Sequence, residues 1–310
     1  MDIFNKEEQI EYRKLLHSTG WNIIDKTQGF LSHYTSPASV YSILSEQKLW
    51  FTDCRYLNDL SEGYFVWDIV DTILKKNDYK KNFINSIIKA RTSQEIPINE
   101  RESVCCDKFV YYVCSFSEND DSLSLWNYYA KTPESAGYNL VFNKKSLIDS
   151  IIGKNSFEKY DYSLIRVIYK KDKQIKCLEP IIDFFYGIWL NCKSKKRAFL
   201  IAEMYHLLQL VALGFKNEAY EDEKEVRLIL HLTEVDNHIR CNNANILRIR
   251  VKGNYFIPYL SLSIDRNALD KIVASPYIKD KTALDSLKLL TQKLELQNRN
   301  VVSSEIPARF

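Results

Sequence analysis

The chain has 310 residues, of which 45% are hydrophobic and 27% are charged, and its net charge is +3. These values are typical of a soluble globular protein that is long enough for a substantial core. The small net charge and the lack of a long Lys or Arg run in the sequence exclude a broadly basic nucleic-acid-binding surface. Nucleic acid is therefore expected only as a substrate that approaches a local site.

The cysteines and the N-terminal residues predict a cytoplasmic protein. There are seven cysteines, an odd number, and none forms a Cys-x-x-Cys pair, which favours reduced thiols over a disulfide framework or a zinc site. The N-terminal sequence is too charged for a signal peptide. The most apolar stretch, 198–215, contains Glu203, His206 and Gln209. We therefore expect a core helix there and no membrane contact.

Several common catalytic motifs are missing from the sequence. Glycine occurs only 8 times, and there is no Gly-x-Gly-x-x-Gly fingerprint, Walker lysine loop, Gly-x-Ser-x-Gly elbow or His-Glu-x-x-His pair. Those chemistries need close backbone approach or paired ligands. Dinucleotide-sheet, nucleoside-triphosphatase, serine-hydrolase and zinc-protease classes are excluded on this basis.

The first half of the chain is predicted to mix helices and strands. A charged amphipathic helix is expected over 1–18 and a strand over 30–35. The step from Thr35 to Pro37 supplies an N-cap and a first-turn proline for a helix through about Gln47. The elements expected next are a strand at 49–52, a helix at 61–75, polar helix and loop at 76–108, a strand at 109–116, a helix at 123–130 and a strand at 138–142.

The second half continues the mixed pattern. It predicts a helix from Lys144, a β-rich stretch at 164–170, helices over roughly 178–215, strands at 226–230, 246–251 and 272–274, a helix at 281–294 and a closing strand near Val301. The sequence contains no internal repeat or low-complexity linker. We expect one α+β domain over 29–310 with a helical insertion at about 178–215, preceded by an N-terminal helical arm over 1–28.

The stretch 220–230 is the most informative part of the sequence, because a cluster of four acids runs directly into an apolar, β-prone run. If 226–230 is a strand, Glu223 and Glu225 share one of its faces with Arg227. Three charged side chains are costly to bury, so this face is expected to line a wet cleft. The alternative is a solvated edge strand whose charges discourage edge pairing.

Polar clusters elsewhere follow a recognisable order. They read His-Tyr-Thr, Asn-Asp-x-x-Glu, Cys-x-Phe-Ser, Leu-Trp-x-x-Tyr-Ala with a later Gly, and Glu-x-Glu-x-Arg, and they lie at 33–35, 58–62, 114–117, 125–130 with Gly137, and 223–227. Over roughly residues 30–310 the chain resembles a large bacterial family catalogued as a domain of unknown function. That family name implies no activity.

The order of elements also resembles, more distantly, ADP-ribosyltransferase folds. The resemblance implies a split mixed or antiparallel sheet with flanking helices, NAD as substrate without a metal, and cleavage of the nicotinamide–ribose bond. Glu225 would be the catalytic carboxylate and Glu223 would orient the acceptor. His33, also a catalytic candidate, would bind the cofactor together with Thr35. Tyr128 or Tyr129 would stack on nicotinamide. The other residues expected near the cofactor are Tyr34, Asn58, Ser117, Trp126 and Arg227.

This resemblance implies an NAD-consuming bacterial toxin or antiphage defence effector. Its partner would be a macromolecular acceptor, nucleic acid or protein, or a protein of the same defence system. A second hypothesis is a sensor module that holds a nucleotide in the same cleft without turnover. A third is a metal-dependent nuclease that places magnesium among acids of distant segments, namely Asp59, Glu62, Glu118, Asp121 and Glu225.

Each candidate residue also has a structural interpretation. Trp126, Tyr128 and Tyr129 have near-helical spacing and fit core packing. Arg227 fits an ion pair with Glu225 or Glu62 that holds the shape of the cleft. The sequence leaves these interpretations open beside the functional ones.

Overall fold

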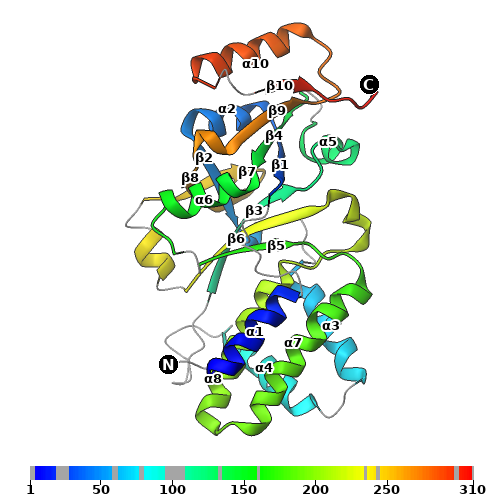
Figure 1. The fold of residues 1–310 in the computed structure, drawn as a ribbon, viewed down its shortest axis with the longest axis vertical. Coiled ribbons are helices and arrows are strands. Elements are labelled where there is room, and N and C mark those ends of the chain that lie inside the picture. Colours follow the sequence, from blue (N-terminus) through cyan, green and yellow to red (C-terminus); the bar gives the residue numbers. More distant parts are fainter. Residues whose placement is uncertain are drawn as a thin grey trace.

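The chain folds into a sheet half and a helical half that follow one another along the long axis of the molecule (Figure 1). This architecture comes from a computed structural model, which describes residues 4–18, 28–57, 62–76, 80–94, 109–131, 135–158, 161–233, 236–241, 245–296 and 300–308. No helix within these ranges is long and apolar enough to cross a membrane.

The described strands form one mixed sheet of ten strands. They are β1 (Phe30–Thr35), β2 (Lys48–Asp53), β3 (Phe109–Ser117), β4 (Tyr138–Asn143), β5 (Tyr162–Arg166), β6 (Glu225–Thr233), β7 (Leu247–Lys252), β8 (Tyr255–Ser263), β9 (Leu269–Ala274) and β10 (Asn300–Ser303). The main path runs β10-β9-β4-β1-β3-β2-β8-β7, and β6 joins β5 to β3 beside it. All pairings are antiparallel except that of β10 with β9.

The sheet is split along one edge of β3. β6 pairs with β3 along its whole length, from Phe109 to Ser117, and so occupies one edge. β1 and β2 must therefore share the other edge. β1 pairs there only at Ser117, whereas β2 pairs at Val113 and Tyr112. Between these points the backbone of β3 faces a gap, and α2 (Pro37–Glu46) connects the two strands that border it.

Helices cover the two faces of the sheet unequally. The described helices are α1 (Lys6–Ser18), α2, α3 (Glu62–Lys76), α4 (Lys81–Gln94), α5 (Leu123–Tyr129), α6 (Lys144–Lys154), α7 (Lys171–Asn191), α8 (Ser194–Ala212) and α10 (Lys281–Lys293), with short 3₁₀ or π turns between strands. Figure 1 shows α1, α3, α4, α7 and α8 gathered below the sheet, and we call these five the helical layer.

Strand alternation determines which residues of β3 and β6 meet the helical layer. On one face, Tyr111, Val113 and Ile229 are buried in the same apolar cluster as α3, α4, α7 and α8. Two residues further along this face, Ser115 and Arg227 oppose each other across the two strands, and Ser117 opposes Glu225. The face thus changes from apolar to polar.

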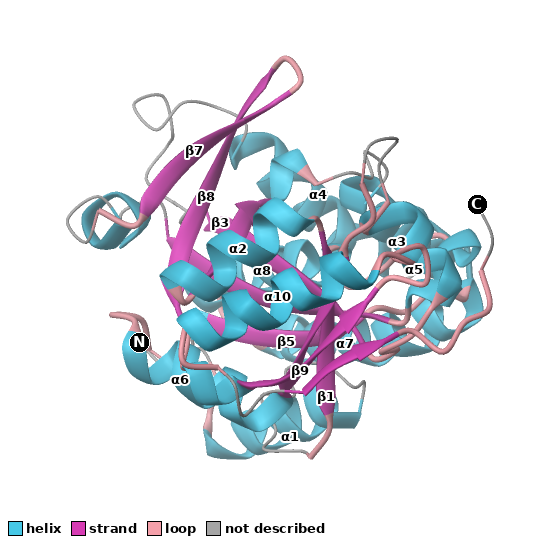
Figure 2. Ribbon diagram, turned by 90° about the horizontal axis from the view of Figure 1, so that it is seen from above, coloured by secondary structure: helices cyan, strands magenta, loops and turns pink. Residues whose placement is uncertain are grey.

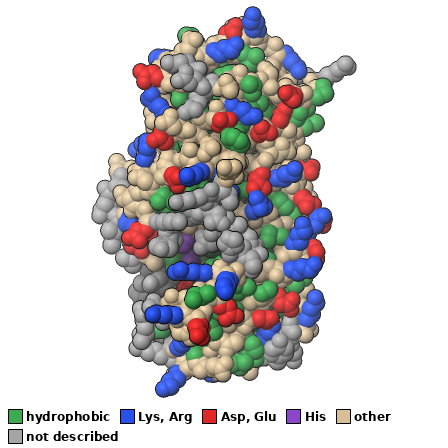
Figure 3. All heavy atoms as spheres, in the orientation of Figure 1, with side chains coloured by type: hydrophobic (Ala, Val, Ile, Leu, Met, Phe, Trp, Pro, Cys, Tyr) green, Lys and Arg blue, Asp and Glu red, His purple; other side chains and the backbone are tan. Residues whose placement is uncertain are grey.

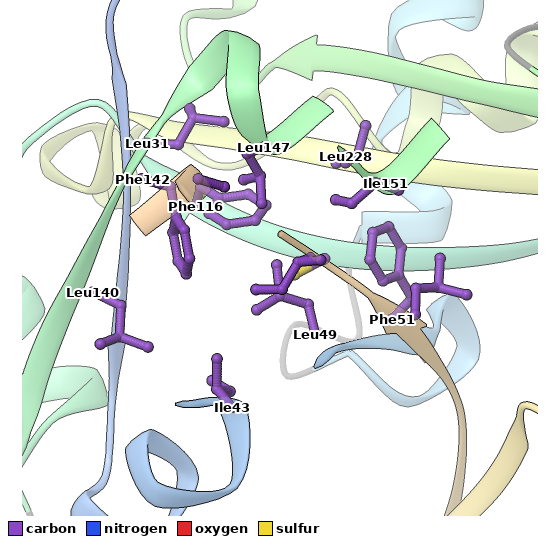
Figure 4. Packing of buried hydrophobic residues seen from close by; sticks show 14 of the residues in the cluster. Leu31, Ile43, Leu49, Phe51, Phe116, Leu140, Phe142, Leu147, Ile151 and Leu228 are labelled. Atoms are coloured by element: carbon purple, nitrogen blue, oxygen red, sulfur yellow. The ribbon is translucent and has the colours of Figure 1, made fainter. Parts of the chain in front are cut away.

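The opposite face of the sheet holds a second core. Cys114, Phe116, Val226 and Leu228 point into it, and they meet residues of α2, α6 and β4. Figure 4 shows Phe116 and Phe142 close together, with their ring centroids 6.3 Å apart, beneath Leu147 of α6. These two cores hold β3 and β6 rigidly where the sheet is split.

The structure confirms a mixed α+β fold with a sheet of parallel and antiparallel pairs, and most predicted elements are present. The sequence prediction missed β8, because Pro258 lies within it and proline lacks the N–H that a strand interior needs. β8 pairs with β2 only as far as Tyr259. Pro258 therefore lies where one edge of the strand is open, which makes it tolerable.

Candidate functional site

A cavity of about 410 Å³ occupies the split between β1 and β2. Its walls come from β1, α2, β2, β3, α5, β6 and β7, together with the segment between α8 and β6. This volume lies within the range of small-molecule and cofactor sites. By strand alternation His33 shares a face with Leu31, whereas Glu225 lies on the other face with Ser117. The gap in the sheet is what lets both line one cavity.

One end of the cavity holds three buried ion pairs that share partners. Lys216 Nζ lies 2.6 Å from Glu223 Oε2 and 3.2 Å from Glu225 Oε2. Arg227 donates from Nε and Nη2 to the two oxygens of Glu225, at 2.8 and 2.9 Å, and from Nη1 to the carbonyl of Leu213 at 2.9 Å. Two carboxylates thus meet two cations in a charge-balanced cluster.

The cluster keeps Glu225 ionised. Burial alone would raise the pKa of this carboxyl, but the charges of Arg227 and Lys216 and hydrogen bonds from Arg227 and Ser115 outweigh burial and lower the pKa to about 2. At neutral pH Glu225 is therefore a fixed negative charge, able to stabilise positive charge and unable to donate a proton.

The two glutamates reach this cluster by a route that differs from the expected one. Glu223 ends a 3₁₀ turn (Glu218–Glu223), and the strand begins only at Glu225. Lys224 between them adopts a left-handed conformation with φ 42°. The prediction that both acids stand on one strand face was wrong, because this single left-handed residue turns the chain; both carboxylates still point at Lys216.

His33 lies on the opposite wall. Its Nδ1 is 3.0 Å from the carbonyl oxygen of Ser115 in the open edge of β3. A carbonyl only accepts, so Nδ1 carries the proton. Burial lowers the pKa of His33, which keeps the ring neutral, although the hydrogen bond to Ser115 opposes this shift. Nε2 is then an acceptor, suited to a ligand hydroxyl.

Tyr34 and Ser117 line the cavity, but their hydroxyls hold its walls together. Tyr34 donates to the carbonyl of Asn119 at 3.0 Å and accepts from the backbone N–H of Ser122 at 3.0 Å. Ser117 donates to the carbonyl of Glu223 at 2.7 Å. These bonds fix the loop before α5 and the turn before β6. Thr35 also lines the cavity.

The three candidate aromatic residues of α5 have three different environments. Trp126 is fully buried, with its ring 4.7 Å from that of Tyr34 and its Nε1 donating to Asp121 at 2.7 Å. Tyr128 is 71% exposed and outside the residues that line the cavity. Tyr129 lines the cavity and donates to Glu223 Oε1 at 2.8 Å. Of the three, only Tyr129 is placed to touch a ligand there.

The remaining sequence candidates are dispersed or undescribed. Asn58 and Asp59 lie outside the described residues, and the side chain of Glu62 is also not described. Glu118 is paired with Arg166, and Asp121 accepts from Trp126 and from Ser304. The acids considered for magnesium therefore have separate partners wherever the structure describes them.

Several residues that line the cavity were not among the sequence candidates, including Trp50, Lys216, Arg250 and Lys252. Arg250 and Lys252 alternate along β7, a pattern that marks one face of a strand but does not show what that face meets. Lys216 follows the long apolar run of α8, and only the folded chain brings it to Glu223.

Comparison with known proteins adds a family for part of the chain. Residues 125–228 match the family model described as "Protein of unknown function (DUF2971)". A domain of unknown function is thus present from α5 to β6, and it includes Tyr129, Lys216, Glu223, Glu225 and Arg227. Neither the search of curated proteins nor the search of solved structures gave a match.

Proposed function

We propose that this protein is an NAD-consuming enzyme of the ADP-ribosyltransferase type and that its cavity binds NAD. One observation carries the proposal: an ionised Glu225 and a neutral His33, remote in sequence, line one cavity at a split in the sheet. The divergence of β1 and β2 from a common edge of β3 supports an ADP-ribosyltransferase-like architecture.

The proposed chemistry uses each side chain in the state described above. The C–N bond between nicotinamide and ribose breaks with its electron pair going to the nicotinamide nitrogen, which leaves as a neutral ring. The fixed charge of Glu225 stabilises the oxocarbenium-like ribose that forms. An acceptor hydroxyl or amine, or water, then bonds to this carbon, and its proton passes to Glu223. His33 Nε2 accepts from a ribose hydroxyl.

Nicotinamide release tests this proposal. The purified protein, alone and with cell extract, is incubated with NAD labelled in the adenylate half, and free nicotinamide and labelled macromolecules are quantified. We expect turnover that Glu225→Gln reduces at least about a hundredfold. Glu221→Gln is the matched control, because Glu221 belongs to the same 3₁₀ turn but lies outside the cavity lining.

A negative outcome is equally defined. If the wild-type protein releases no nicotinamide, labels nothing in any extract and shows no change in melting temperature with NAD, the proposal is wrong. An active protein would fit our wider proposal of a bacterial toxin or antiphage defence effector that modifies a nucleic-acid or protein acceptor.

One observation favours a second function, a sensor that binds a nucleotide without turnover. Both carboxylates are already neutralised by Lys216 and Arg227, and this lessens their attraction for a developing cation. In that case NAD or a related nucleotide raises the melting temperature, Glu225→Gln weakens this shift, and no product forms with the wild-type protein.

A further inference from the structure

The end of the cavity opposite the carboxylates is built from β2 and the β7–β8 hairpin. Figure 2 shows this hairpin projecting beyond the helices that cover the sheet. Arg250 pairs with Ile257 and Lys252 with Tyr255 across the hairpin, and both basic residues line the cavity. The opposite face of the hairpin carries the exposed residues Ile249, Val251 and Phe256. By strand alternation, Arg250 and Lys252 therefore lie on the face that borders the cavity.

Arg250 is held in position by an aromatic ledge and a hydroxyl. Its guanidinium carbon lies 5.6 Å from the ring centroid of Trp50 and 5.9 Å from that of Tyr259, within cation–π range. Nη2 donates to Thr52 Oγ1 at 3.0 Å. A guanidinium held in this way loses little further freedom when it binds a ligand.

The charge of Arg250 has no carboxylate to balance it within the described residues. Its Nε is buried without a hydrogen-bond partner there, and Nη1 has no hydrogen bond to a described residue. Burial lowers the pKa of Arg250. The groups that oppose this shift are Tyr259 and Cys114, and neither of them is a carboxylic acid. Arg227, by contrast, is matched by Glu225.

Cationic side chains outnumber carboxylates among the described residues that line the cavity. Four cationic side chains line it, Lys216, Arg227, Arg250 and Lys252, against the two carboxylates Glu223 and Glu225. These carboxylates pair with Lys216 and Arg227, and the described lining at the hairpin end contains Arg250 and Lys252 but no carboxylate. Figure 3 shows acidic and basic side chains interspersed over the described part of the face that it displays, so that part of the surface does not share this bias.

We propose that Arg250, positioned by Thr52 and Trp50 and assisted by Lys252, is the binding residue for the phosphate or diphosphate group of the ligand. The planar fork of an arginine matches two phosphate oxygens, and a partly buried cation such as Arg250 gains more from an anion than a fully exposed one does. The inference deepens the proposed function, on which it rests for the identity of the ligand as a nucleotide.

ADP, pyrophosphate and nicotinamide are the probes that test this subsite, with binding followed by calorimetry. We expect Arg250→Gln to weaken ADP and pyrophosphate about 10–100-fold and to leave nicotinamide binding unchanged. Arg250→Lys keeps the positive charge but not the planar guanidinium, so its affinity for ADP and pyrophosphate should lie between those of the wild type and Arg250→Gln. Arg248→Gln is the matched control, since Arg248 is an exposed arginine of the same strand outside the cavity lining.

The outcomes separate this subsite from the proposed reaction. If ADP binds and Arg250→Gln weakens it while NAD is not consumed, the subsite stands and the reaction fails. If NAD is consumed and folded Arg250→Gln, verified by its melting curve, keeps the wild-type KM, the subsite is wrong. Equal losses in Arg248→Gln and Arg250→Gln, or ADP binding that Arg250→Gln leaves intact, would also overturn it.

Discussion

Lys216 is the residue on which the acidic end of the cavity depends, because it contacts both Glu223 and Glu225 and is itself buried. We predict that Lys216→Met lowers the free energy of unfolding by about 3 kcal/mol, because it leaves buried carboxylates short of one cation. Urea unfolding monitored by circular dichroism measures this loss.

A second substitution checks the cause. Adding Glu223→Gln to Lys216→Met removes the carboxylate that is left without its cation, so part of the lost stability should return. If the double variant is less stable than Lys216→Met by the full effect of Glu223→Gln in the wild type, the two residues are not coupled and the shared-cation account fails.

Gly137 fills a position that no larger residue fits. A Cβ there would lie 2.1 Å from the carbonyl oxygen of Thr35 and 2.9 Å from that of Ala130, both of them backbone atoms. We predict that Gly137→Ala destabilises the protein by at least about 2 kcal/mol and weakens ligand binding through the displacement of β1. Thermal melts and ligand titrations measure the two effects.

Gly153 is the matched control for this substitution. It lies in α6, and a Cβ there would meet nothing within 4 Å. Gly153→Ala should be neutral or stabilise by up to about 1 kcal/mol, because alanine favours the helix. Similar melting temperatures for Gly137→Ala and the wild type would show that the close approach is not a constraint.

At the scale of elements, the turn between the 3₁₀ segment and β6 positions both glutamates. Lys224 has φ 42° and its carbonyl accepts from the N–H of Glu118 at 3.0 Å. We predict that Lys224→Val destabilises by about 1–2 kcal/mol, since a β-branched residue is strained in this conformation, whereas Lys224→Gly is tolerated. Chemical denaturation of both variants tests this, and equal stability of the two would contradict the turn geometry.

Local sequence patterns account for most of the elements. The short β-prone runs that became β1, β3 and β4 and the capped start of α2 at Ser36 carry enough local signal to be read directly. β8 was not predicted because Pro258 argues against a strand. The proline is compatible with a strand only where one edge is unpaired, which the sequence does not reveal. The left-handed conformation of Lys224 was not predicted because lysine, unlike glycine, does not indicate a positive φ.

At the scale of the whole molecule, two partly buried histidines between the sheet and the helical layer contribute to the response to acid, as does His33, whose pKa is also lowered by burial. Burial, with the nearby His231, lowers the pKa of His206 to about 3, and burial lowers that of His231 to about 4 despite Asp161. Tyr111 and Phe109 enclose His206, with the Tyr111 hydroxyl 2.7 Å from Nδ1. Both rings are neutral in the native protein at pH 5.

The unfolded chain binds protons at these histidines with a pKa near 6.5, so between about pH 6.5 and 4 it holds more protons than the native protein. Stability is therefore complete above pH 6.5 and declines as the pH falls, with a slope of about 1.4 kcal/mol per pH unit for each histidine. Glu225 adds to the loss only below about pH 4.5, where its unfolded form is protonated and its native form is not.

Urea titrations from pH 7 to 4.5 measure the slope that the histidines produce. His231→Gln should reduce the slope by the share of one histidine, about 1.4 kcal/mol per pH unit, whatever its effect on stability at pH 7. An unfolding free energy that does not change between pH 6.5 and 4.5 would contradict the burial of neutral histidines at this interface.

The cavity itself is a property of the whole fold. The sequence indicated the two ends of the site separately, at His33 and at Glu223 with Glu225, and only the split in the sheet joins them. Lys216 and Arg250 have no local pattern that marks them. Lys216 meets Glu223 because the turn between them folds back, and Arg250 meets Trp50, which is far away in sequence. Trp126 is the opposite case: the sequence motif marked it as a site residue, but it is fully buried and supports the fold.

A structure of the Glu225→Gln variant with NAD bound tests the central claim most directly, because this variant should bind the dinucleotide without cleaving it. We expect the nicotinamide ribose beside Gln at position 225 and Tyr129, a ribose hydroxyl on His33 Nε2 and the diphosphate on Arg250. NAD bound outside the split between β1 and β2, or no bound NAD at saturating concentration, would contradict the account.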